Sequence, residues 1–148
     1  MDTVGAYRKA WNKKQKELRK VLEKAASTHE IFEVFSLQHG MLHSAALTGG
    51  RDFSFEDEVF SDLPEEIARR IPRNKDHSIA WCIWHIARIE DITMNILIAG
   101  RDQLFRKENW SDRLGIPFLH TGNDMGEQNI AEISAGIDLE ALRAYRLE

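Results

Sequence analysis

Residues 76–100 read DHSIAWCIWHIARIEDITMNILIAG, and this stretch predicts one long helix. Asp76 can accept hydrogen bonds from the free N–H groups of the first turn, and Gly100 can adopt the left-handed conformation that often follows a helix. No proline interrupts the stretch. The sequence therefore predicts a helix over about 76–99, around which the rest of the chain is arranged.

Apolar side chains cover most of this predicted helix. At about 100° per residue, one side carries Ile79, Ile83, Ile86, Met94 and Leu97, and the other carries Trp81, Ile89, Ile92 and Ile96. A helix that is apolar on nearly every side is expected to be buried by its neighbours. It is not expected to span a membrane, because a span needs about 20 residues with few charges, and this stretch contains His85, Arg88, Glu90 and Asp91.

Two polar side chains lie within the apolar sides of this helix. His85 falls among Trp81 and Ile89, and Glu90 falls beside Ile83. Burial of a polar group without a hydrogen-bond partner is costly, so each of the two requires a specific neighbour. For Glu90 the sequence leaves two alternatives open, an ion pair with an arginine such as Arg88 or a hydrogen bond to a metal-ligating histidine.

The composition is that of an ordinary globular protein. The chain has 148 residues, 43% hydrophobic and 30% charged, which fits a single domain over 1–148 or two small lobes. The net charge of −4 argues against a nucleic-acid partner. The single Cys82 lies among apolar residues as an expected core residue, and a cytoplasmic location is expected because no signal peptide or anchor is recognised.

Helical periodicity recurs along the rest of the chain, and no alternating strand pattern is found. Helical segments are expected at about 4–26, 29–47, 64–70, 127–135 and 139–147. Residues 53–63 are expected to form a short helix or a turn-rich crossover, and residues 102–114 one or two short helices. Ser27 or Thr28 is expected to cap the second segment, and Ser54 is expected to cap the segment at 53–63. The expected fold class is therefore all-α, and the last segment reads as a helix cut short at the C-terminus.

His39 and His43 are four residues apart on the second predicted helix, so their side chains point the same way one turn apart. This spacing recurs where one helix supplies two imidazoles to a metal ion. With His85 as a third ligand, three neutral imidazoles would leave an open coordination position for chemistry. The structural alternative is that the pair lines a helix edge while His85 bonds a backbone carbonyl.

The other candidate residues carry less chemistry. His29, His77 and His120 are not assigned as ligands. Four aromatic residues can either line an apolar pocket or belong to the hydrophobic core: Phe32, Phe35, Trp81 and Trp84. No glycine-rich phosphate loop, nucleophile elbow or Cys-x-x-Cys pair is present, which disfavours those enzyme classes.

The segment IAWCIWHIARIED, residues 79–91, resembles the DinB-like superfamily, whose second helix carries a similar Trp-His segment. The resemblance extends loosely to QHGMLHS, residues 38–44. It implies an up-and-down four-helix bundle with long connections, often dimeric, that commonly holds nickel or zinc through three histidines. Some members catalyse thiol-dependent transfers or isomerisations, and many have no known activity.

The chain departs from that family pattern at one point. The histidine pair of the better-known members lies on a late helix, whereas no histidine follows His120 here. Only His85 matches a family position, so His39 and His43 would supply the pair from an earlier helix. A shortened bundle could also be completed by a second copy of the chain.

Two hypotheses follow for function. The first is a divalent-metal-binding protein of DinB-like type, in which His39, His43 and His85 bind Ni²⁺ or Zn²⁺ and the open position takes water or a low-molecular-weight thiol, as in a thiol transferase or hydrolase. The alternative is a non-enzymatic homodimer without a metal centre, in which the apolar central helix is buried against a second subunit. Nothing in the sequence distinguishes among substrates.

Overall fold

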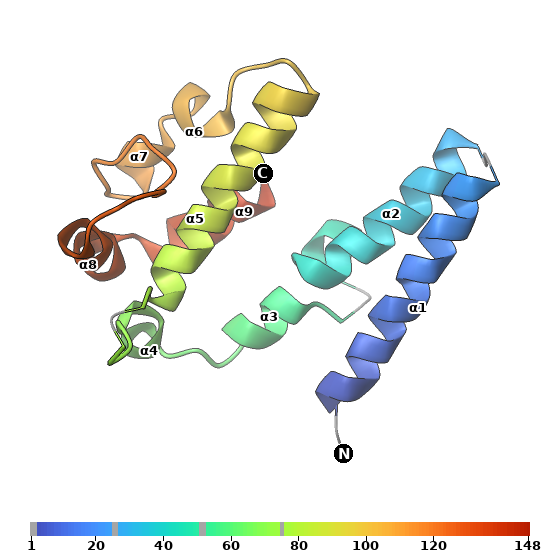
Figure 1. The fold of residues 1–148 in the computed structure, drawn as a ribbon, viewed down its shortest axis with the longest axis horizontal. Coiled ribbons are helices and arrows are strands. Elements are labelled where there is room, and N and C mark those ends of the chain that lie inside the picture. Colours follow the sequence, from blue (N-terminus) through green and yellow to red (C-terminus); the bar gives the residue numbers. More distant parts are fainter. Residues whose placement is uncertain (1–2, 25–26, 51–52, 75) are drawn as a thin grey trace. The chain divides into compact units, whose positions relative to one another are not determined.

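The computed structural model describes residues 3–24, 27–50, 53–74 and 76–148. The chain divides into two compact units, Met1–Asp62 and Leu63–Glu148, and each is described by itself (Figure 1). Within these described ranges the regular structure is helical and contains no strand, which confirms the all-α prediction. None of the described helices has both the length and the apolar character needed to cross a membrane.

The first unit is built on two long helices that pack side by side (Figure 1). Its elements are α1 (Thr3–Glu23), α2 (Thr28–Leu42), the 3-10 helix η1 (Ala45–Thr48) and α3 (Phe55–Phe60). Ser27 caps α2, because its hydroxyl accepts a hydrogen bond from the N–H of Glu30 at 3.2 Å. Ser54 caps α3 by accepting from the N–H of Asp57 at 3.1 Å. Both caps were predicted from the sequence.

The second predicted helix, 29–47, was expected to be continuous, but it breaks at His43. Side chains of the following segment bind the backbone at this break. The Ser54 hydroxyl donates to the carbonyl of His43 at 2.9 Å, and the N–H of Ala45 donates to Asp57 at 2.8 Å. These hydrogen bonds replace those that a continuing helix would make, so α2 ends beside α3.

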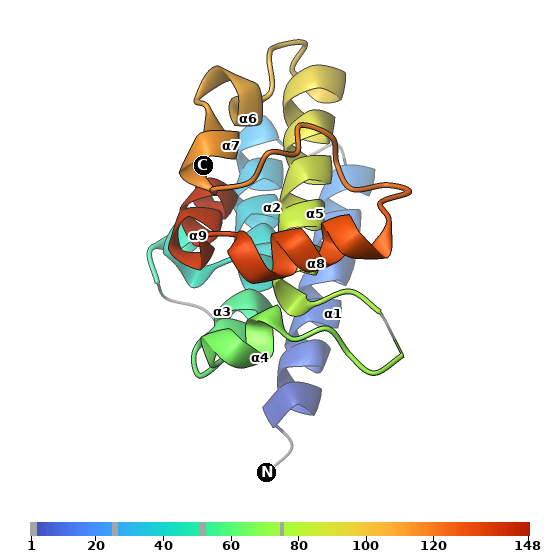
Figure 2. The same cartoon turned by 90° about the vertical axis from the view of Figure 1, so that its left-hand side faces the viewer.

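The second unit is arranged around α5, which contacts α4, α6, α8 and α9. Figure 2 shows α8 crossing α5. The elements are α4 (Glu65–Arg69), α5 (Ile79–Asp91), the π-helix η2 (Ile92–Ile98), α6 (Leu104–Lys107), α7 (Trp110–Arg113), α8 (Glu127–Gly136) and α9 (Leu139–Leu147). The helix predicted to be central therefore contacts most of the other helices of its unit.

The start of α5 differs from the prediction. Ser78, not Asp76, is the cap, and its hydroxyl accepts from the N–H of Trp81 at 3.1 Å. The Asp76 carboxylate instead accepts from the N–H of His77 at 2.8 Å, and this hydrogen bond lowers the pKa of Asp76. At the other end Gly100 has a φ of +63°, which confirms the left-handed residue predicted there.

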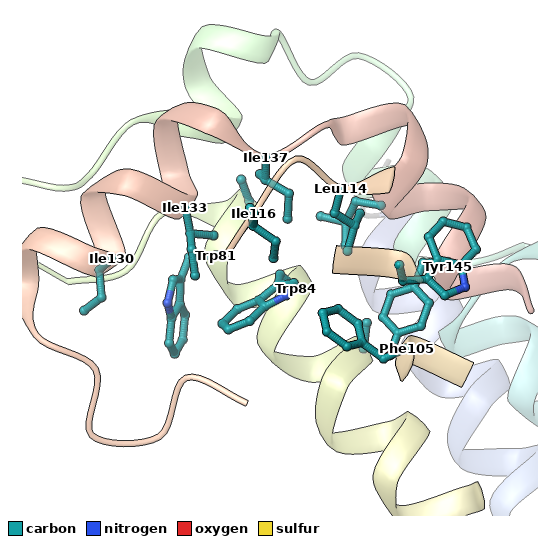
Figure 3. Packing of buried hydrophobic residues seen from close by; sticks show 13 residues of the cluster. Trp81, Trp84, Phe105, Leu114, Ile116, Ile130, Ile133, Ile137 and Tyr145 are labelled. Atoms are coloured by element: carbon teal, nitrogen blue, oxygen red, sulfur yellow. The ribbon is translucent and has the colours of Figure 1, made fainter. Parts of the chain in front are cut away.

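Aromatic and aliphatic side chains form the core of the second unit. Its buried members are Ala80, Trp81, Trp84, Ala87, Phe105, Trp110, Leu114, Ile116, Ile130, Ile133, Ile137, Leu142 and Tyr145. Figure 3 shows Trp81 and Trp84 projecting from α5 toward Ile133 and Ile116. Full burial of a large apolar side chain contributes roughly 1.5–3 kcal/mol, so this cluster accounts for much of the unit's stability.

The exposed apolar residues correct two expectations. The central helix was expected to be buried on nearly every side, yet Ile86 is 52% exposed and Leu97 is 73% exposed. Phe32 and Phe35 on α2 are also exposed, so they are not core residues. Three polar side chains of α5 and η2 are buried instead: Arg88, Asp91 and Asn95. They can be buried because they form an ion pair and a hydrogen bond with one another.

The Asp91 carboxylate is the centre of this buried polar network. Its Oδ1 accepts from the N–H of Leu104 and from the Asn95 amide, at 2.8 and 2.7 Å. Its Oδ2 accepts from the N–H of Phe105 at 2.8 Å and from the Tyr145 hydroxyl at 2.6 Å. One carboxylate of α5 thus binds both the first turn of α6 and the Tyr145 side chain of α9. Burial, with the hydrogen bond to Asp91, raises the pKa of Tyr145.

Arg88 balances the charge of Asp91. Its Nη1 lies 3.5 Å from Oδ2 of Asp91, and its guanidinium lies 3.6 Å from the centre of the Phe105 ring. Its Nη2 donates to the carbonyl of Leu119 at 3.1 Å, in the loop that follows α7. The pair therefore links α5 to α6, to α9 and to this loop.

We expect Asp91→Ala to lower the free energy of unfolding by about 3–5 kcal/mol, because the buried Arg88 charge loses its counterion. Tyr145→Phe removes one hydrogen bond and should cost about 1 kcal/mol. Urea unfolding followed by tryptophan fluorescence measures both changes. Asp102→Ala, at an exposed carboxylate, is the control, and a loss for Asp91→Ala no larger than that of the control would contradict the account.

Candidate functional site

His39 and His43 lie together near the end of α2. Their rings are stacked, with centroids 4.3 Å apart and an angle of 30° between the planes. The i, i+4 spacing places them one turn apart, as predicted, and the N–H of His43 donates to the carbonyl of His39 at 3.0 Å. The two imidazoles therefore point the same way from one rigid turn.

Within its own unit the pair has neighbours on α2 and α3. The Phe35 ring stacks on His39 at a centroid distance of 5.7 Å. Nδ1 of His43 lies 3.9 Å from Oε2 of Glu56, and both side chains are mostly buried. Glu56 is therefore an acidic neighbour of this imidazole, at a distance too long for a direct hydrogen bond. No pattern in the sequence indicated this proximity, because Glu56 and His43 lie on different segments of the chain.

His85 is fixed by a single strong hydrogen bond within its own unit. Its Nδ1 lies 2.7 Å from the carbonyl oxygen of Thr121. A carbonyl can only accept, so Nδ1 carries the proton and the neutral ring keeps its lone pair on Nε2. The Trp81 ring stacks on His85 at 4.8 Å with an angle of 14°, which holds the imidazole plane.

The loop that presents the Thr121 carbonyl packs closely against the rings of Trp81 and Trp84. Gly122 has a φ of +96°, and a Cβ at this position would lie 2.7 Å from the ring of Trp84. Its N–H donates to Nδ1 of His120 at 3.0 Å. Only glycine combines this backbone conformation with so close an approach, so Gly122 determines where the Thr121 carbonyl lies.

Glu90 resolves one of the alternatives left open by the sequence. Its Oε2 accepts from Nη1 of Arg146 at 2.8 Å. The expected partner Arg88 bonds Asp91 instead, because Asp91 lies one turn farther along the same buried side of α5. Glu90 therefore pairs with an arginine, but this arginine is Arg146 and not Arg88.

The remaining histidines and the cysteine have local roles. His77 bonds Asp76 at 3.1 Å, and His29 lies 3.9 Å from Glu33 on the exposed side of α2. Cys82 is partly buried, and burial is the main cause that raises the pKa of its thiol. A thiol with a raised pKa is a poor nucleophile near neutral pH, in keeping with a core residue.

The predicted ligands thus divide between the two units. The structure brings His39 and His43 together in the first unit, and it fixes the tautomer of His85 in the second. The prediction that all three bind one ion stays a prediction. The hydrogen bond from His85 to a backbone carbonyl is the structural role weighed above, and it is also how proteins commonly orient a ligating imidazole.

Comparison with known proteins gives one match. The sequence model of a protein family described as the DinB superfamily matches residues 57–146, which is more than half of the chain. The match begins inside α3 and covers all of the second unit except its last two residues, so it contains His85 but neither His39 nor His43. No curated protein and no solved structure matches the chain.

We expect Gly122→Ala to lower the free energy of unfolding by about 1–3 kcal/mol, because of the positive φ and the contact with Trp84. The loop should move away from His85, and the neutral imidazole should then no longer be held as the Nδ1–H tautomer. Long-range ¹⁵N–¹H NMR reports the tautomer directly. Gly126→Ala, where φ is −72° and no atom lies near the new Cβ, is the matched control. A wild-type His85 in the Nε2–H form would contradict the geometry.

Proposed function

Because this chain belongs to the DinB superfamily, we propose that it is a divalent-metal-binding helical protein. The ion is held by the imidazoles of His39 and His43, with His85 as the third ligand. Ni²⁺ and Zn²⁺ are the metals that suit nitrogen ligands of this kind. The family match supports the class of protein, and the arrangement of the imidazoles supports the choice of ligands.

The observation that carries the proposal is the stacked pair on α2. Two imidazoles with centroids 4.3 Å apart, on one turn of one helix, present two nitrogen donors in the same direction. Glu56 beside Nδ1 of His43 supplies the carboxylate that commonly supports a ligating histidine.

His85 suits the role of third ligand for a different reason. Its proton is held on Nδ1 by Thr121, so the ring does not have to change tautomer before it binds a metal through Nε2. Trp81 holds the plane of the ring. This preorganisation lowers the entropic cost of forming a metal site.

Three nitrogen ligands leave a position for a further ligand. A bound ion would supply Lewis acidity there, which acidifies a water or stabilises a thiolate. The chain's own residues orient the imidazoles. A metal-dependent thiol transferase or hydrolase is the activity that this chemistry supports.

The first test measures metal in untagged protein after loading with Ni²⁺ or Zn²⁺ and removal of the excess. We expect about one ion per chain by elemental analysis, and loss of that ion in His39→Ala and in His43→Ala. His29→Ala, on the same helix but exposed, is the control and should keep the metal. A wild-type protein without stoichiometric metal, or metal retained in both α2 variants, would overturn the proposal.

The second test concerns His85 and pH. His85→Ala should lower the metal affinity by tenfold or more, since one nitrogen donor is removed. Affinity in the wild type should fall as the pH is lowered, because protons compete for the imidazole nitrogens. Isothermal titration measures both effects. An unchanged affinity in His85→Ala would remove it from the ligand set and leave the α2 pair.

A second candidate function is that of a homodimerising helical protein, and the exposed apolar side chains of each unit favour it. In the second unit Leu97 and Ile98 are 73% and 69% exposed at the end of η2. In the first unit Phe32 is 64% exposed on α2. Large apolar residues at neighbouring exposed positions are typical of surfaces that bind another protein.

Light scattering tests this second candidate. A homodimer has twice the 17.1 kDa mass of the chain. Leu97→Lys combined with Ile98→Lys should shift the mass to that of a monomer, because two charges would be buried in the contact. Lys107→Glu, at an exposed polar site, is the control. A wild-type monomer at high protein concentration would reject the dimer.

A further inference from the structure

A cavity of about 450 Å³ lies in the second unit, where the segment after α4 leads into α5. Its volume is in the range of sites that bind small organic molecules. Its lining comes from the end of α4, from the segment at 70–73 and from the first turn of α5. None of these residues takes part in the metal-binding proposal.

One part of the cavity wall is apolar. Ile67 comes from α4, Ile79 is the first residue of α5, and Pro72 lies between them. Ile71 packs against the hydrophobic core, so this side of the cavity is held in place by the rest of the unit. Such a lining suits the hydrocarbon part of a ligand.

The charges at the cavity have one sign. Arg70 and Arg73 both line it and both are exposed. Neither side chain makes a hydrogen bond or an ion pair with the residues that the structure describes. The adjacent Arg69 differs, because it bonds Glu65 at 2.8 Å and the carbonyl of Ala135 at 3.0 Å.

His77 completes the polar part of the lining. Its Nδ1 lies 3.1 Å from Oδ1 of Asp76, whose exposed carboxylate is not part of the lining, so the two arginines are the permanently charged groups of the cavity wall. The amino end of α5 adds a partial positive charge at the same place. The cavity therefore combines two guanidinium groups that lack counterions with an apolar wall.

We propose that this cavity binds a small carboxylic acid with an apolar chain. The carboxylate pairs with Arg70 and Arg73, since guanidinium groups bind carboxylates with two parallel hydrogen bonds. The hydrocarbon chain lies against Ile67, Ile71 and Ile79. The alternative, two solvated arginines beside a surface depression, predicts no saturable binding.

The test is a titration of the full, metal-free chain with octanoate, followed through the methyl resonances of its isoleucines by NMR. The methyl groups of Ile67, Ile71 and Ile79 should shift together and saturate. Acetate should bind more weakly than octanoate by about tenfold or more, because it lacks the hydrocarbon chain that contacts the apolar wall. Octyltrimethylammonium, which has the same chain and the opposite charge, should not shift these resonances.

The variants separate charge from apolar contact. Arg70→Gln combined with Arg73→Gln should weaken octanoate binding by about tenfold, at roughly two- to fivefold for each exposed ion pair. Arg19→Gln, an exposed arginine of α1, is the control with the same loss of charge and should bind as the wild type does. His39→Ala should also bind octanoate normally, so failure of the metal proposal would not affect this result.

Three results would overturn the proposal. The first is the absence of saturable shifts at Ile67 and Ile79. The second is equal octanoate affinity in the wild type and in the double arginine variant. The third is binding of octyltrimethylammonium as tightly as octanoate, which would indicate apolar adsorption without recognition of the acid.

Discussion

The buried pair of Asp91 and Arg88 is the interaction on which the second unit depends. Asp91 accepts hydrogen bonds from the first turn of α6 and from Tyr145 of α9, and Arg88 reaches the carbonyl of Leu119. A carboxylate with four hydrogen bonds and a counterion can be buried without a large net cost. Removal of either partner leaves an uncompensated charge in the core. The pair therefore fixes which side of α5 faces inward, although isoleucines are available on its other sides.

The same pair helps to position His85. The carbonyl of Leu119 that binds Arg88 lies in the loop that also presents the carbonyl of Thr121 to His85. Gly122 allows this loop to pass against Trp84. The tautomer of His85 is thus set by a chain of contacts that begins at Asp91, and the nitrogen left for a ligand is Nε2. In the first unit the corresponding arrangement is simpler, because one helical turn aligns His39 with His43.

Local patterns in the sequence predicted those features that depend on residues close together along the chain. The caps at Ser27 and Ser54, and the shared direction of His39 and His43, depend on residues three or four positions apart. Contacts across long separations could not be predicted. Ser78 caps α5 in place of Asp76 and also bonds Ser134, 56 residues away. The partner of His85 is 36 residues away, and Tyr145 is 54 residues from Asp91. Periodicity indicates that a polar residue faces the core but does not indicate which distant group satisfies it.

X-ray absorption spectroscopy of the nickel- or zinc-loaded protein tests the metal proposal most directly, because it identifies the atoms around the ion. The account predicts nitrogen donors at about 2.0–2.1 Å and outer-shell scattering from at least two imidazole rings. A first shell made of oxygen donors alone, without imidazole scattering, would contradict it.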